Sequence, residues 1–321
     1  MYARTATATA SLAAAALLGA GALLLIPHSQ ATDSGTDTAA GARTDTSTEK
    51  VIRTVVNTRA IPTPGAPVVL AHRGASAYAP ENTLAAVDRA NHLGFDWVEN
   101  DVQRTKDGVL VVIHDTDLKR TTNVEKVFPK RAPWAVEDFT AAEIARLDAG
   151  SWFAARYAGT RIPTLAQYLD RIERNDQNLL LELKSPQTYP GIEKETLRVL
   201  RQKGWLNPGH VRYRLVIQSF SAGSIKKVHQ QRPDITTGFL GTPAVADLKA
   251  YAAFTDQINP SYASISSRYV AAAHALKGAH GRKLRVNTWT VDDAATARKV
   301  DGFHVDGIIT NTPDMVRRAT D

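Results

Sequence analysis

The sequence predicts a (β/α)8 barrel, and three observations lead to that prediction. From Pro67 onward, short apolar runs rich in Val, Ile and Leu alternate with amphipathic stretches of helical period, which favours a parallel sheet with crossover helices. Eight such units fall within about 255 residues, the usual size of a (β/α)8 barrel. An open doubly wound sheet is the alternative, but no glycine-rich phosphate loop follows the first strand.

The expected elements follow one another at regular spacing. The eight strands are expected over residues 68–73, 96–101, 178–184, 214–220, 235–240, 262–267, 284–291 and 306–311. Helices are expected over residues 82–93, 192–203, 221–231, 269–279, 292–300 and 313–319. Because a barrel gathers the carboxyl ends of its strands at one mouth, polar residues at those ends are expected to meet there.

One further strand, residues 109–115, does not fit the repeat, because only the segment RTKDG separates it from the strand before. That spacing indicates an antiparallel hairpin with the Asp-Gly pair in its turn. With that pair at the centre of the turn, Asp101 faces His114; with the turn one residue earlier, Glu99 faces it. Both registers bring two carboxylates and an imidazole together, because alternation puts Glu99 and Asp101 on one face.

The stretch after the hairpin, residues 116–161, is too long for an ordinary βα loop. It is expected to be an insertion over one end of the barrel, at the end that holds the active site.

The first part of the chain resembles an export signal. In residues 1–31, a short start with one arginine leads into SLAAAALLGAGALLLIP and then small residues, so cleavage is expected after Ala31. An uncleaved anchor is the alternative, although the apolar run is shorter than the roughly 20 residues that span a bilayer. Residues 32–65, rich in Thr, Ala, Ser and Asp, are expected to be a flexible linker to the barrel domain, 66–321. The protein is therefore expected to be secreted or held in the cell envelope, without a stable membrane span after cleavage.

Composition narrows the chemistry. The chain has no cysteine, which excludes a disulfide framework, a zinc-thiolate site and a cysteine nucleophile. The formal charge is +7, and removing residues 1–31 with their single arginine makes it +6, a modest and dispersed excess. No basic run suggests nucleic acid, so the expected partner is a small molecule. The sequence leaves the oligomeric state open.

Polar side chains gather at the predicted strand ends in greater number than packing requires. They are His72, Arg73, Glu99, Asp101, Glu182, Lys184, Gln218, Asn287 and Trp289, with His114 returned by the hairpin. Three converging carboxylates would repel one another unless a divalent cation lay among them, and Ca2+ or Mg2+ prefers such oxygen ligands. Two histidines can act as base and acid across one bond, and an arginine fork suits phosphate oxygens. Together these groups indicate hydrolysis of a phosphodiester.

The chain also resembles a known family, the glycerophosphodiester phosphodiesterases, which are (β/α)8 barrels related to the phosphatidylinositol-specific phospholipases C. The resemblance is carried, in order over residues 68–314, by AHRGASAYAPENT, VENDVQRTKDGVLVVIHD, LKRTT, IPTLAQYL, LELKSP, VIQSF, NTWTV and DGIITNTPD. It implies hydrolysis of a glycerophosphodiester to sn-glycerol 3-phosphate and an alcohol, with one divalent cation, Ca2+ or Mg2+. One departure is Asn100, which stands where the family usually has an apolar residue.

The resemblance also implies a role for each site residue. It makes His72 and His114 the acid and base pair, Glu99, Asp101 and Glu182 the metal ligands, Arg73 and Lys184 the phosphate contacts, and Trp289 a neighbour of the glycerol. Glu81 and Asn82 are expected to support the loop and first helix that hold the first histidine, with Asn82 as a helix cap.

Two other functions remain open on the sequence alone. One is a phospholipase D-like or C-like activity on phospholipids or lysophospholipids, for which SWFAARY (residues 151–157) would supply an apolar rim. The other is a surface-binding barrel without turnover. The headgroup preference and the route, direct or through a cyclic phosphate, are not fixed by the sequence.

Overall fold

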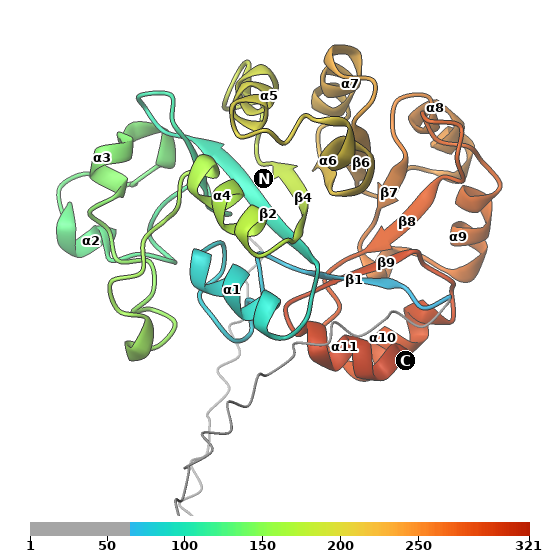
Figure 1. Ribbon diagram of the computed structural model, residues 1–321, viewed down its shortest axis with the longest axis horizontal. Helices are drawn as coiled ribbons and strands as arrows, with labels where there is room; N and C mark the ends of the chain where they lie inside the picture. The colour runs from blue at the N-terminus through green and yellow to red at the C-terminus, as the bar shows by residue number, and fades with distance from the viewer. Residues whose placement is uncertain (1–64) are drawn as a thin grey trace, which may run out of the picture. The chain divides into compact units, whose positions relative to one another are not determined.

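Residues 65–321 are described by a computed structural model of the chain (Figure 1). The expected signal peptide, residues 1–31, lies outside the described residues, as do residues 32–64 of the expected linker. Between residues 65 and 321, no helix has the length and apolar character needed to cross a membrane.

Eight parallel strands close into a barrel, which confirms the predicted fold. β1 (Val68–Ala71) pairs with β2 (Trp97–Arg104) on one side and with β9 (Gly307–Thr310) on the other, so the sheet has no open edge within the barrel. The remaining barrel strands are β4 (Asn178–Leu183), β5 (Leu215–Ser219), β6 (Thr236–Leu240), β7 (Gln257–Asn259) and β8 (Arg285–Thr288).

Helices surround the strands (Figure 1). They are α1 (Leu84–His92), α4 (Leu165–Arg174), α5 (Ile192–Gln202), α6 (Pro208–Tyr213), α7 (Ala222–Gln231), α8 (Leu248–Ala252), α9 (Ser267–His274), α10 (Ala294–Asp301) and α11 (Pro313–Thr320). Two large apolar clusters lie between helices and sheet, whereas the apolar cluster inside the barrel has only four fully buried members, Leu70, Leu180, Val216 and Ile309. The apolar layer therefore fills only the middle of the barrel interior, and polar side chains line its two ends.

The expected strand over 262–267 is wrong. The sixth barrel strand is β7, and residues Tyr262–Ser264 form a single 3-10 turn. β7 presents the buried side chains of Gln257 and Asn259, which hydrogen-bond to amides on β8 and β5. Because this strand is short and polar where it faces inward, a search for apolar runs passes over it.

Both registers expected for the hairpin are wrong by one residue. β3 (Leu110–Val112) pairs with β2 so that Val102 faces Val112, and the loop has three residues with Gly108 at a φ of +83°. A three-residue loop that ends in a left-handed glycine is a common alternative to the two-residue turn. The ladder ends at Val112, and His114 lies beyond it at the mouth of the barrel.

The insertion after the hairpin has its own small apolar core. It contains α2 (Val124–Val127) and α3 (Ala141–Ile144), and buried side chains such as Leu118 and Phe139 form its centre. Figure 1 shows α2 and α3 outside the helix ring, on the side of α1 and α4. The Tyr157 hydroxyl donates to the carbonyl of Tyr78, so the insertion contacts the loop that follows β1.

Candidate active site

The turn after β1 holds the first histidine and arginine at the carboxyl end of the barrel. Gly74 has a φ of +80°, and a Cβ there would lie 2.6 Å from the backbone of Ala86, so the turn requires glycine. Arg73 is also left-handed, with a φ of +56°, and its backbone N–H donates to Glu99 Oε2 at 2.9 Å. Strained backbone of this kind persists where its surroundings hold it, often at functional sites.

Three buried carboxylates converge beside this turn, as predicted. Glu99 and Asp101 lie on the inward face of β2, and Glu182 of β4 is in register with Asp101. One oxygen from each lies within 4.8 Å of the other two, and all three residues are no more than 5% exposed. All the donors are oxygens, which is the set that Ca2+ and Mg2+ prefer.

Electrostatics show that the cluster has more negative charge than its neighbours balance. Burial and the charges of Asp101 and Glu182 raise the pKa of Glu99 well above its usual value. Burial and the charge of Asp101 raise the pKa of Glu182 to about 8. Although burial alone would raise it, the charges of Arg73 and Lys184 lower the pKa of Asp101 to about 2. The Glu182 carboxyl thus retains a proton at neutral pH, and a divalent cation is the natural replacement for that proton.

Two cationic side chains form ion pairs with these carboxylates. Arg73 Nε lies 3.3 Å from Asp101 Oδ2, and Lys184 Nζ lies 3.0 Å from Glu182 Oε1 and 3.5 Å from Asp101 Oδ1. The pocket over the cluster is small, about 90 Å³, and both cations line it together with the two histidines. The structure thus brings together the predicted acids, imidazoles and phosphate-binding cations.

His72 is held by an amide. Its Nδ1 lies 2.7 Å from Asn311 Oδ1, and the Asn311 amide nitrogen donates to Asp292 at 2.6 Å, which fixes the oxygen toward the imidazole. Because an amide oxygen only accepts, Nδ1 carries the hydrogen and Nε2 presents a lone pair. Burial and the charge of Arg73 lower the pKa of His72 to about 4, so it is neutral at neutral pH.

His114 is held by a carboxylate instead. Its Nδ1 lies 2.7 Å from Asp115 Oδ1, and Arg120 clasps Asp115 through Nε at 2.6 Å and Nη2 at 3.0 Å. The hydrogen bond from His114 and the charge of Arg120 lower the pKa of Asp115. The same guanidinium donates to both oxygens of Glu81, which in turn accepts from Arg73 at 2.8 Å. A chain of charges therefore links the two halves of the site.

The supporting residues act differently from the expectation. Thr83, not Asn82, caps α1, since its hydroxyl accepts from the backbone of Ala86. Asn82 adopts a left-handed φ of +58°, and its amide donates to Asp101 Oδ2 at 2.8 Å. Asn82 was expected as a cap because asparagine favours that position. Here it orients a carboxylate of the cluster.

Aromatic side chains form one wall of the pocket. The Trp289 ring nitrogen donates to the carbonyl of Asn259 at 2.7 Å, and its ring packs edge to face on Phe220. Gln218 lines the same pocket. Asn287, expected at this mouth, is not there: it lies within β8, two residues before Trp289, and lines a cavity at the opposite end of the barrel.

Sequence reasoning missed three residues that orient the histidines, Arg120, Asn311 and Asp292. Two of them lie in segments that carried the family resemblance, LKRTT and DGIITNTPD, but no chemical pattern linked them to the histidines. All three reach the site from loops, where contacts depend on the folded chain.

Comparison with known proteins agrees with this geometry. The sequence profile of the glycerophosphoryl diester phosphodiesterase family matches residues 72–315. The chain is 34% identical over 268 residues to the glycerophosphodiester phosphodiesterase of Bacillus subtilis, covering 78% of this chain and 85% of that relative. It is 36% identical over 257 residues to the glycerophosphodiester phosphodiesterase of Caldanaerobacter subterraneus, covering 78% and 96%.

Solved structures show the same fold. An Oleispira antarctica phosphodiesterase in complex with the product sn-glycerol-3-phosphate superposes with a TM-score of 0.66 at 28% identity, covering 79% of this chain and 96% of that one. The profile match spans most of the chain, and relatives above 30% identity cover more than two thirds of it. The chain therefore belongs to the glycerophosphoryl diester phosphodiesterase family and is a phosphodiesterase.

Proposed function

We propose that this chain hydrolyses glycerophosphodiesters to sn-glycerol 3-phosphate and an alcohol, with one divalent cation, Ca2+ or Mg2+, and two histidines. The observation that carries the proposal is the cluster of three buried carboxylates within 4.8 Å of one another, two of which, Glu99 and Glu182, line one pocket with His72 and His114. The product named for the Oleispira antarctica relative has the same chemistry.

Glu99, Asp101 and Glu182 are the proposed ligands of the cation. Their all-oxygen donor set and the proton that Glu182 retains at neutral pH both fit a divalent ion. When bound, such an ion supplies positive charge against the phosphate oxygens. Arg73 and Lys184 are released from part of their pairing with the carboxylates in that state and are proposed to bind the phosphate. The ring of Trp289 is proposed to lie against the glycerol.

The two histidines are proposed to divide the proton transfers. His72 is neutral, with its Nε2 lone pair free, and takes the proton from the attacking hydroxyl, either water or the substrate's own glycerol hydroxyl. His114, whose Nδ1 is held by the Asp115 carboxylate, gives a proton from Nε2 to the leaving oxygen. One P–O bond forms as the other breaks, and the net transfer of one proton leaves a neutral alcohol. Attack by water gives sn-glycerol 3-phosphate directly. Attack by the glycerol hydroxyl gives a cyclic phosphate, which water then opens to sn-glycerol 3-phosphate in a second step. A general base or acid contributes about 10²- to 10⁴-fold in such a step.

The substrate assay uses the full chain and glycerophosphocholine, and it measures the release of sn-glycerol 3-phosphate. Chelator should abolish release, and Ca2+ or Mg2+ should restore it. His72→Ala and His114→Ala should each lower kcat at least about 10²-fold, whereas His92→Ala, an exposed histidine on α1, should leave it unchanged. Release that persists in chelator removes the cation from the proposal, and full activity in either active-site variant removes that histidine.

Two alternatives receive less support. In SWFAARY, Phe153 packs edge to face on Trp152 and on Tyr157, and of these three aromatic residues only Trp152 is exposed, so the segment does not present a broad apolar rim. A phospholipase-like activity would show as faster hydrolysis of lysolipid micelles than of soluble diesters. A barrel without turnover is not favoured, since every proposed acid and histidine is in place.

We further propose that the protein is exported and cleaved after Ala31, on the grounds of its amino-terminal sequence. N-terminal sequencing of protein recovered from outside the cell should begin at Thr32; protein that begins at Met1 and stays with the membrane would support the uncleaved anchor.

A further inference from the structure

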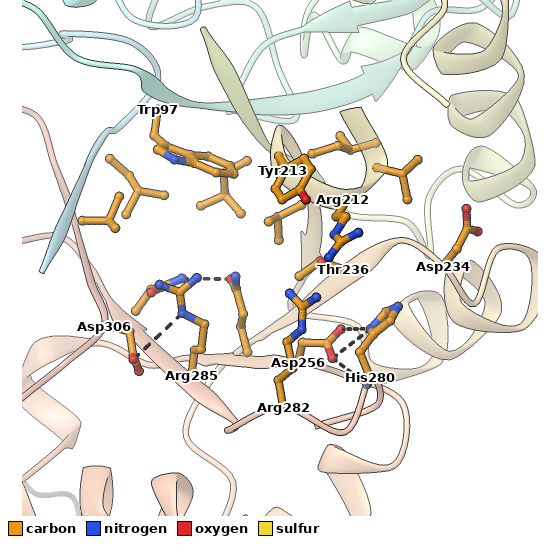
Figure 2. Close-up of a pocket in the computed structure, with 18 of the residues that line it drawn as sticks. Trp97, Arg212, Tyr213, Asp234, Thr236, Asp256, His280, Arg282, Arg285 and Asp306 are labelled. Atoms are coloured by element: carbon orange, nitrogen blue, oxygen red, sulfur yellow. Dashed lines mark hydrogen bonds and ion pairs between the residues drawn. The ribbon is translucent and has the colours of Figure 1, made fainter. Parts of the chain in front are cut away.

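A second cavity opens at the amino-terminal end of the barrel, opposite the carboxylate cluster (Figure 2). Its volume is about 920 Å³, against about 90 Å³ for the active-site pocket. Its lining includes the first residues of six barrel strands, Val68, Trp97, Leu215, Thr236, Gln257 and Arg285. Cavities of roughly 300–1,000 Å³ are those that take small organic ligands. No residue proposed for catalysis lines it.

One half of this cavity is apolar. Leu70, Leu180 and Val216, which form the apolar layer inside the barrel, make its floor. The Trp97 indole and Val211 of α6 extend the apolar wall toward solvent. An apolar surface that continues from a floor to an open rim suits a hydrocarbon chain rather than a polar metabolite.

The other half is cationic. Figure 2 shows Arg212, Arg282 and Arg285 pointing into the same space. Among residues 65–321, neither Arg212 nor Arg282 makes an ion pair, and Arg285 Nε lies 3.9 Å from an Asp306 oxygen that Lys283 approaches to 2.8 Å.

The acids of the lining are already paired with other groups. Asp234 is held by Arg232, and Asp256 is held by His280. Five Lys and Arg side chains and three Asp side chains line the cavity, so the lining carries an excess of two positive charges. Guanidinium forks bind carboxylate and phosphate oxygens in pairs, so the missing partner is an anion of that kind.

We propose that this cavity binds a single-chain amphiphile with an anionic headgroup, an acyl chain that ends in a carboxylate or a phosphate. The acyl chain lies along Trp97 and the apolar floor, and the headgroup lies among Arg212, Arg282 and Arg285. An inorganic anion would leave the apolar half uncovered, and a neutral lipid would leave the guanidinium groups unbalanced. This inference does not depend on the function proposed for the opposite mouth.

The test uses quenching of tryptophan fluorescence in the full chain, because the two ends of the barrel carry separate reporters. Trp97 lines this cavity and Trp289 lines the active-site pocket, among five tryptophans in the chain. The probes are a long-chain fatty acid and a lysophosphatidate, each brominated on the chain and used below its micelle concentration. Quenching should be saturable, should persist in Trp289→Phe and should be lost in Trp97→Phe. The probe that binds more tightly identifies the headgroup.

The arginine variants test the headgroup contacts. Arg282→Gln combined with Arg285→Gln should weaken the apparent Kd at least about tenfold, and Arg268→Gln, an exposed arginine on α9, should leave it unchanged. Hydrolytic activity should be the same in all these arginine variants. If Trp97→Phe does not fold, the change in apparent Kd in the double variant Arg282→Gln, Arg285→Gln, measured by quenching with Trp97 intact, tests the proposal instead.

Three results would overturn the proposal. One is quenching that is lost in Trp289→Phe, which would place the amphiphile at the active-site end. Another is equal affinity in the arginine pair and the wild type. The last is an absence of quenching in the full chain. That result would mean that the cavity holds water or the chain's own residues ahead of Gly65 instead of an amphiphile.

Discussion

The two histidines of the site differ in the group that holds Nδ1. An amide oxygen holds His72, whereas the Asp115 carboxylate holds His114. Arg120 then holds Asp115 in place through two hydrogen bonds. Asp115 and Arg120 therefore orient His114 and leave its Nε2 as the nitrogen available for proton transfer.

Asp115→Asn and Arg120→Gln should lower kcat by less than the roughly 10²- to 10⁴-fold loss expected for His114→Ala, with KM little changed. Arg120→Lys should recover only part of the rate, since lysine cannot clasp two carboxylates. Lys119→Gln, at the exposed neighbouring position, is the matched control. An unchanged kcat in Asp115→Asn would argue against this role.

Asn100 is a buried residue that lowers the free energy of unfolding. It is fully buried opposite Leu181, and neither its amide nitrogen nor its amide oxygen has a hydrogen-bond partner among the described residues. Burying an unsatisfied polar group costs about 1–3 kcal/mol. Asn100→Val should therefore raise the free energy of unfolding by about that amount, as measured by denaturant titration.

Gln103 is the matched contrast for that experiment. It is equally buried on the same strand, but its amide donates to the carbonyls of Ile113, His114 and Asp115 and accepts from Tyr189. Gln103→Leu should destabilise the fold, because it leaves those partners unsatisfied. Equal effects of the two substitutions would show that hydrogen bonding does not decide stability at these positions.

At the scale of elements, the sequence predicts what depends on apolar periodicity. β1, β4 and β5 are predicted from the sequence because each contains a run of consecutive apolar residues. Strand alternation also correctly places Glu99 and Asp101 on one face. α4 was not predicted, although Thr164 and Gln167 form a capping box that is readable from the sequence.

Other elements could not be found in that way. β7 was missed because its inward side chains are amides that hydrogen-bond across strands, and a hydrogen-bond ladder leaves no apolar signal. The hairpin register was missed because one extra loop residue shifts the pairing without changing the apolar pattern. The network around Arg120 needs the insertion to fold against the loop after β1, which no local pattern encodes.

At the scale of the whole molecule, the carboxylate cluster makes stability depend on pH when no cation is bound. The pKa of Glu182 is about 8 in the folded chain, against a usual 4.5, so between those values the folded chain holds a proton that the unfolded chain has lost. Stability therefore falls as pH rises through this window. His72, with its pKa lowered from 6.5 to about 4, acts in the opposite direction only below pH 6.5.

Between pH 6.5 and 8, the effect of Glu182 on stability therefore acts without the opposing effect of His72. In chelator, the Tm of the full chain should fall across that interval, and saturating Mg2+ or Ca2+ should remove the slope because the cation replaces the proton. Glu182→Gln in chelator should show a shallower fall than the wild type, since Glu99 alone then contributes. A Tm that rises with pH in chelator would contradict the assigned protonation.

Glu99, Asp101 and Glu182 are proposed to hold one divalent cation. Calorimetric titration of the chelator-stripped full chain with Mg2+ and Ca2+ tests this binding most directly. We predict saturable binding of one ion per chain, lost in Glu182→Gln and retained in Glu195→Gln, a control on α5 whose carboxylate pairs with Arg104. No saturable binding in the wild type, or the same binding in Glu182→Gln, would contradict the account.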